Sequence, residues 1–153
     1  MSAAVSRVGS TVLILAALAA PGCGRGTTGP PEIVVDRTAC DHCRMLVSDV
    51  RYAAAFQAPA AEAKVFDDIG CLLAAVQKER GEHLAMWFRD ADDGQWIPGA
   101  QAIFVSTPAI RTPMSGGVVA YRDRAAAERA AAHNDGTIVG SVAELLESRK
   151  AGS

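Results

Sequence analysis

The feature that most constrains the fold is a pattern that occurs twice along the chain. Each occurrence has a β-prone run ending in an aromatic residue (Phe66, Tyr121), an aspartate soon after it (Asp68, Asp123), a helical stretch, and a further β-prone run beyond a glycine. Another β-prone run precedes each occurrence. The order therefore predicts an α+β fold of two similar ββαβ units packed as one compact body. A length of 153 residues suits one domain.

Aspartates and apolar spacing define the two main helices. Asp67 or Asp68 offers an N-cap carboxylate. Apolar residues then follow at i, i+3, i+4 and i+7, the stripe of an amphipathic helix: Ile69, Leu72, Leu73 and Val76. We expect this helix to end at Gly81. Asp123 caps a second, alanine-rich helix that runs to about His133.

Short runs of β-branched, aromatic and other apolar residues predict the strands. We expect them at residues 33–35, 52–57, 64–66, 84–89, 96–97, 102–105, 118–121 and 137–139. Ser141 and Glu144 have the spacing of a capping box, which predicts a third, short helix. The two units should then span about residues 32–95 and 96–148.

The N-terminus has the pattern of an export signal. Arg7 supplies a positive charge, and the apolar run 12–20 is shorter than the roughly 20 residues that a membrane-spanning helix needs. The run ends in small residues followed by Cys23, which is typical of bacterial lipoproteins, although Ala20 stands where leucine is usual. We expect residues 1–22 to be a lipoprotein signal peptide, with lipid attached to Cys23. The alternative is an ordinary signal peptide with an incidental cysteine.

Residues 23–31 then form the lipid anchor and a flexible linker rich in glycine and proline. These features predict a lipid-anchored protein of the cell envelope that faces the periplasm or the cell exterior. The formal net charge is −2, and no basic run interleaved with aromatic residues is present, so nothing favours nucleic-acid binding.

Soft ligands are concentrated in residues 40–45, Cys-Asp-His-Cys-Arg-Met. Thiolate and thioether sulfur select Cu(I) over hard cations. Cys43 and Met45 point to the same face of an extended chain but lie about 200° apart on a helix, so their spacing predicts an extended or looped segment. Met114 lies in a loop rich in proline and glycine, residues 107–117, where no periodic pattern explains burial. It is a further candidate ligand.

The remaining cysteines leave two questions open. In an oxidising compartment Cys40 and Cys43 can form a disulfide, which would compete with metal binding. Cys71 lies about 200° from Ile69 around its helix, off the apolar stripe. We therefore expect Cys71 to pack away from the main core, either as a small filler against a second surface or as a functional thiol.

Other chemistries fit the residues less well. A haem attachment site needs histidine where Arg44 stands. A thioredoxin-like pair would lie at a helix N-terminus, whereas this motif precedes β-prone sequence. A structural zinc site needs four ligands, and the residues beyond the C-x-x-C pair are scattered: His42, Cys71, His83 and His133. No nucleophile with a base and an orienting group is apparent, so no enzymatic activity is predicted.

Several motifs, in order, resemble those of the NosL family, lipoproteins that act as accessory factors for nitrous-oxide reductase. The resemblance runs from about Ile33 to Leu146. Its motifs are Cys40-x-x-Cys43-x-Met45, the run FDDIGCL from Phe66 to Leu72, Trp96 after an Asp-Gly turn, Thr112-Pro113-Met114 and an alanine-rich capped helix.

The resemblance implies a Cu(I) chaperone that supplies nitrous-oxide reductase or another copper enzyme. It also implies two ββαβ units similar in fold to organomercurial lyase. By residue match the Cu(I) ligands are Cys43, Met45 and Met114, and Cys40 has a less defined part. The alternative function is an exported interaction module, stabilised by zinc or a disulfide, with a redox-active C-x-x-C.

The chain departs from the family pattern at Arg44, where glycine is usual. Arginine rarely adopts positive φ, so we expect a differently shaped loop. A cation beside the site would also favour the thiolate.

Overall fold

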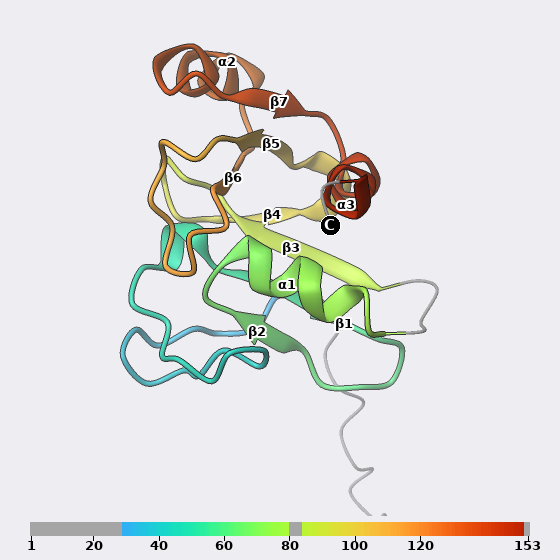
Figure 1. Cartoon of the computed structure of the whole chain (residues 1–153). Helices are drawn as coiled ribbons and strands as arrows, with labels where there is room; N and C mark the ends of the chain where they lie inside the picture. Colours follow the sequence, from blue (N-terminus) through green and yellow to red (C-terminus); the bar gives the residue numbers. More distant parts are fainter. Residues whose placement is uncertain (1–28, 80–83, 152–153) are drawn as a thin grey trace, which may run out of the picture.

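The computed structural model describes residues 29–79 and 84–151, and its strands form two antiparallel sheets (Figure 1). The first has the order β2-β1-β3-β4 and contains β1 (Ala54–Gln57), β2 (Lys64–Phe66), β3 (Ala85–Arg89) and β4 (Trp96–Pro98). The second has the order β6-β5-β7 and contains β5 (Ile103–Ser106), β6 (Val118–Tyr121) and β7 (Thr137–Val139). The α+β class expected from the sequence is confirmed.

Helices connect the second and third strands of each sheet. Helix α1 (Ile69–Val76) follows β2 and α2 (Arg124–His133) follows β6, while α3 (Val142–Ala151) follows the last strand. Short 3₁₀ helices lie at Val50–Tyr52 and Gly99–Gln101. Strand β4 pairs with β3. Residues 96–98 therefore belong to the first sheet, whereas the expected limit between residues 95 and 96 placed them with the second unit.

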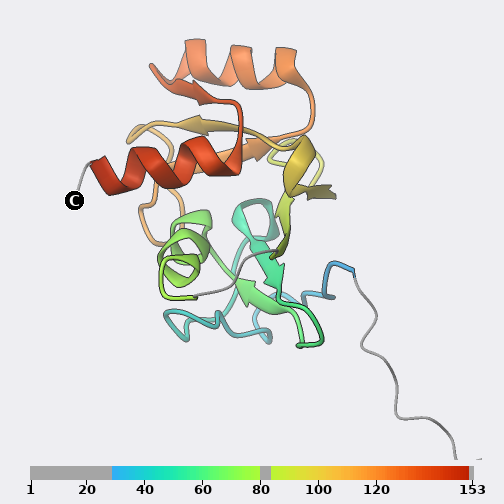
Figure 2. The ribbon, with the colours of Figure 1, turned by 90° about the vertical axis from the view of Figure 1, so that its right-hand side faces the viewer.

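Alternate residues of each strand face opposite sides, as a pleated strand requires. In β5, Phe104 enters the main core and Val105 enters a smaller cluster on the other face of the second sheet. The Phe104 ring meets the edge of Phe88 from the first sheet, with centroids 4.8 Å apart. The main core is thus shared by both sheets, together with α1 and α3 (Figure 2).

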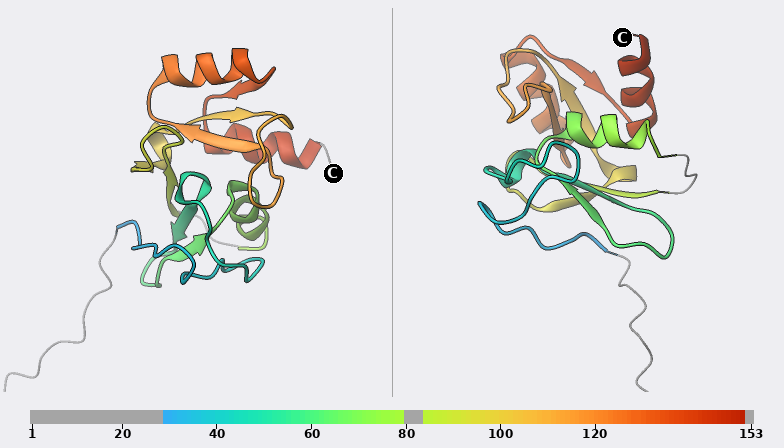
Figure 3. Two further views of the ribbon diagram at one scale, coloured as in Figure 1. Left: turned by 90° about the vertical axis from the view of Figure 1, so that its left-hand side faces the viewer. Right: turned by 60° about the horizontal axis from the view of Figure 1, so that its bottom comes forward.

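The outer faces of the two sheets have separate covers. Helix α2 lies on the second sheet through its buried alanines, Ala126, Ala127 and Ala131. At the opposite end of the molecule the N-terminal segment lies against the first sheet, where Ile33 packs on Val47 and Val65 (Figure 3). The expected strand at residues 33–35 does not form, because the chain turns there and Asp36 donates its amide to the Val47 carbonyl at 2.9 Å.

The helix caps are where the sequence placed them. Asp68 caps α1 and Asp123 caps α2, each accepting a hydrogen bond from a first-turn amide. Helix α1 ends at Val76; Gly81, its expected terminus, lies outside the described residues, as do residues 1–28 with the export signal and Cys23. Within the described residues, no helix has the length and apolar character needed to cross a bilayer.

Candidate metal centre

Residues 40–45 form a tight turn, in agreement with the expected loop. The Cys40 amide donates to the Met45 carbonyl at 2.8 Å, and the Arg44 amide donates to the Cys40 carbonyl at 3.0 Å. Arg44 has φ +67°, a left-handed conformation that costs a non-glycine residue about 1–2 kcal/mol. The expectation that arginine would avoid this conformation is wrong, because the surrounding hydrogen bonds impose it.

The Arg44 side chain extends into solvent beside Asp41. It is 73% exposed, and its guanidinium is 3.9 Å from a carboxylate oxygen of Asp41. Asp41 in turn binds the turn to β2: its amide donates to the Val65 carbonyl at 2.8 Å and its carboxylate accepts the Val65 amide at 2.7 Å. This pairing positions the turn beside the end of β2 and the start of α1.

Four ligand-type side chains meet at that junction: Cys40, Cys43, Asp67 and Cys71. One ligand atom from each lies within 4.8 Å of the others. Cys40, Asp67 and Cys71 are at most 4% exposed, whereas Cys43 is half-buried. The Cys43 thiol donates to Asp67 Oδ1 at 3.5 Å, and all three cysteines are free thiols. The donor set is three sulfurs and one carboxylate.

Cys71 departs from the sequence expectation, since it belongs to the main core cluster. The side of α1 opposite the apolar stripe is covered by the turn 40–45, which brings Cys40 and Cys43 onto Cys71. Asp67 was interpreted only as a possible helix cap. Asp68 caps the helix, and the Asp67 carboxylate belongs to the cysteine cluster. Two successive aspartates, of which a cap needs only one, were the sequence signal that could have indicated this second role.

Burial controls the protonation of the inner thiols. Desolvation raises the pKa of Cys40 and, more strongly, the pKa of Cys71, which the negative charge of Asp67 raises further. Both thiols therefore keep their protons at neutral pH. A metal ion that binds them must displace these protons.

The two candidate thioether ligands lie at the surface. Met45 is 54% exposed and Met114 is 43% exposed. Met114 lines a hollow of about 240 Å³ together with Cys71 and the exposed His42. The structure therefore brings the Met114 loop next to the cysteine cluster, while Met45 stands on the turn itself and does not line that hollow.

Asp68 fixes the Met114 loop to the start of α1. One carboxylate oxygen accepts the Gly70 amide at 2.6 Å, and the other accepts the Thr112 hydroxyl at 2.5 Å and the Met114 amide at 3.0 Å. A side chain at Gly116 would collide with this carboxylate. The Gly116 carbonyl accepts a hydrogen bond from Arg149 of α3 at 2.7 Å. The loop is therefore held from both sides.

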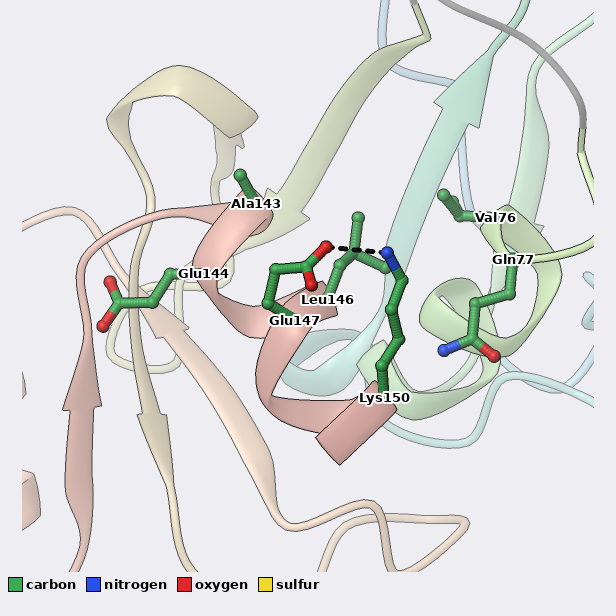
Figure 4. A pocket seen from close by; sticks show the side chains of 7 residues that line it. All are labelled: Val76, Gln77, Ala143, Glu144, Leu146, Glu147 and Lys150. Carbon is green, nitrogen blue, oxygen red and sulfur yellow. Dashed lines mark hydrogen bonds and ion pairs between the residues drawn. The ribbon is translucent and has the colours of Figure 1, made fainter. Parts of the chain in front are cut away.

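Other parts of the described chain present fewer potential metal ligands. A larger hollow, of about 730 Å³, lies between the C-terminal end of α1 and α3 (Figure 4). Its lining includes Val76, Leu146 and the ion pair of Lys150 with Glu147, and no sulfur or imidazole. His133 lies exposed in the last turn of α2. His83 lies outside the described residues.

Comparison with known proteins identifies the family. The NosL family model matches residues 31–147. The chain belongs to the NosL family. Among solved structures, this NosL protein is similar to the crystal structure of the copper chaperone NosL from Shewanella denitrificans, with a TM-score of 0.60 and 16% sequence identity. The match covers 72% of this chain and 94% of the Shewanella chain.

The two comparisons carry different weight. The family match confirms the resemblance found in the sequence motifs. The structural match supports the fold, since 16% identity is too low to transfer more. No curated protein sequence matches the chain.

Proposed function

We propose that this NosL protein binds Cu(I) and delivers it as a chaperone rather than acting as an enzyme. The observation that carries the proposal is the exposure of two methionines near the cysteine cluster: Met45, 54% exposed, follows the half-buried Cys43 on the same turn, and Met114, 43% exposed, lines a hollow with Cys71. Hydrophobic packing does not explain methionine side chains that are exposed to solvent. A thioether that binds a soft ion does explain them. The family membership and the described role of the Shewanella relative as a copper chaperone agree with this function.

The proposed ligands of the delivered ion are Cys43, Met45 and Met114, and Cys40 serves as an auxiliary thiol. One thiolate balances the single charge of Cu(I), and the thioethers add no charge. Because these side chains lie at the surface, a recipient's ligand can approach the bound ion directly. An open site of few ligands suits a carrier, which must release the ion as well as hold it.

The proposal extends to the recipient and the location. Nitrous-oxide reductase, or another copper enzyme, is the proposed acceptor. Lipid at Cys23 would hold the domain at a membrane in the cell envelope, with residues up to 31 as its tether. In each sheet a helix connects the second strand to the third, and the first strand lies between these two. This shared order supports two ββαβ repeats, as in organomercurial lyase.

The ligand set can be tested by anaerobic competition for Cu(I) with a chromogenic chelator. Cys43→Ser, Met45→Leu and Met114→Leu should each weaken binding, because leucine keeps the size of methionine but has no sulfur. Met86→Leu in β3 is the matched control and should leave binding unchanged. Wild-type affinity in Cys43→Ser and in both surface methionine variants would refute the function.

The cysteine cluster also supports a second candidate, an interaction module that zinc or a Cys40–Cys43 disulfide stabilises. That module would unfold when a chelator or a reductant is added. The copper chaperone should stay folded, because its main core is apolar and includes four buried phenylalanines. Circular dichroism after each treatment distinguishes the two.

A further inference from the structure

We infer that Cys40, Cys43 and Cys71 form a second, inner Cu(I) site, and that Cys43 bridges it to the outer, methionine-containing site. The inference rests on the proposed function for the identity of the ion. Its own basis is the cluster at the junction of the turn 40–45 with α1. Cys71 is not a ligand of the proposed delivery site, but it lies there beside Cys40 and Cys43, which are.

The geometry suits three-sulfur coordination. Thiolate sulfurs lie about 2.3 Å from a bound d¹⁰ ion, as for zinc, which puts the corners of a trigonal set about 4 Å apart. The cysteine sulfurs are already within 4.8 Å of one another. If side-chain rotation shifted each sulfur by less than about 1 Å, the site would be complete without movement of the backbone.

The elements that carry these sulfurs are fixed before any ion binds. Asp41 pairs the turn with Val65 through two hydrogen bonds, and Asp68 caps the helix turn that carries Cys71. Cys40 and Cys71 are 0% and 4% exposed, whereas Cys43 is half-buried and is the most exposed of the three cysteines. Cys43 is therefore the natural ligand to share with the outer site.

Charge favours two ions over one. Three thiolates around a single Cu(I) leave two excess negative charges in a buried site beside Asp67, which is costly. A second Cu(I) on the exposed side of Cys43 reduces the excess to one. The thiol protons leave to the buffer, and each ion keeps its oxidation state.

Anaerobic titration of the full chain with Cu(I) tests the inner site. The wild type should bind two equivalents, and X-ray absorption of Met45→Leu/Met114→Leu at one equivalent should count three sulfurs around copper, which Cys43 alone of the outer ligands cannot supply. Cys71→Ala should bind one equivalent that still depends on Met114. Met45→Leu/Met114→Leu should bind one equivalent that depends on Cys71, and Cys43→Ser should lose both.

The outcomes separate the two proposals. One equivalent in the wild type with no change in Cys71→Ala overturns the inner site and leaves the outer site intact. Two equivalents that are insensitive to Met45 and Met114 support the inner site and count against the outer ligands. Cys71→Ser serves as a second variant, and far-ultraviolet circular dichroism confirms that each variant is folded before the sulfurs are counted.

Discussion

Removal of the Asp68 carboxylate should cost much more than removal of an ordinary helix cap. Asp68 is fully buried and accepts hydrogen bonds from Gly70, Thr112 and Met114. A hydrogen bond to a charged group contributes about 1.5–3 kcal/mol, and Asp68→Ala leaves three donors without this acceptor. Since these contributions are not additive, we expect a loss of about 3–5 kcal/mol of unfolding free energy.

The chain supplies a matched control at the start of α2. Asp123 is also an N-cap, but it is exposed, and within the described chain its carboxylate accepts one hydrogen bond, from the Ala126 amide at 2.8 Å. Asp123→Ala should cost about 1 kcal/mol. Urea denaturation of the metal-free proteins gives both values, and the difference between them measures what Asp68 does beyond capping.

Copper binding should separate the same two variants. Asp68→Ala frees the Met114 loop, so the methionine-dependent Cu(I) affinity should fall at least about tenfold, which corresponds to about 1.4 kcal/mol. Asp123→Ala should bind Cu(I) as the wild type does. Equal stability losses in the two variants, or unchanged copper binding in folded Asp68→Ala, would refute the role of Asp68 as the anchor of the loop.

Three further predictions concern the cysteine turn. Arg44→Gly should raise the free energy of unfolding by about 0.5–1 kcal/mol and so move the urea midpoint upward, because glycine adopts φ +67° without the left-handed penalty but loses more entropy on folding. At pH 8 a maleimide should label Cys43 first, and Cys40 and Cys71 only on unfolding, because both are buried and their thiol pKa values are raised. The raised pKa of Cys71 also makes stability pH-dependent, because the folded state binds the thiol proton more tightly than the unfolded state does. The contribution of this proton to the free energy of unfolding is complete below the ordinary thiol pKa of 9.0. That contribution is lost as the pH rises above 9.0, by at most about 1.4 kcal/mol per pH unit, and Cys71→Ala should show a shallower loss in denaturation series.

Local signals in the sequence were sufficient for most elements. Strands β2 and β6 and helix α2 lie where the β-prone runs and the capping aspartate predicted them, because these signals act within a few residues. Residues 33–35 have strand-like side chains but find no partner strand, so a turn forms instead. The pairing of β4 with β3 likewise depends on tertiary contacts and not on its own residues.

The sequence predicted only part of the site, because some of its residues meet only through tertiary contacts. The sulfur run and Met114 were apparent as isolated patterns, but the position of Cys71 depends on which segment covers the far side of α1. That cover comes from the turn 40–45, which is remote in sequence and is held by the backbone pairing of Asp41 with Val65. Arg44 shows the converse effect, since tertiary hydrogen bonds override its local preference.

Two successive aspartates at the start of α1 serve different sulfur segments, and they can be tested separately. Asp68 has an extended backbone, so neighbouring side chains point to opposite sides: Asp67 contacts Cys43, and Asp68 binds the Met114 loop. Asp67→Asn removes a negative charge that raises the pKa of Cys71, and should therefore tighten the cysteine-dependent Cu(I) equivalent at neutral pH. Asp68→Asn keeps one acceptor oxygen and should weaken the methionine-dependent equivalent. Competition titrations that give both variants the same sign of change would show that the two carboxylates do not divide the site in this way.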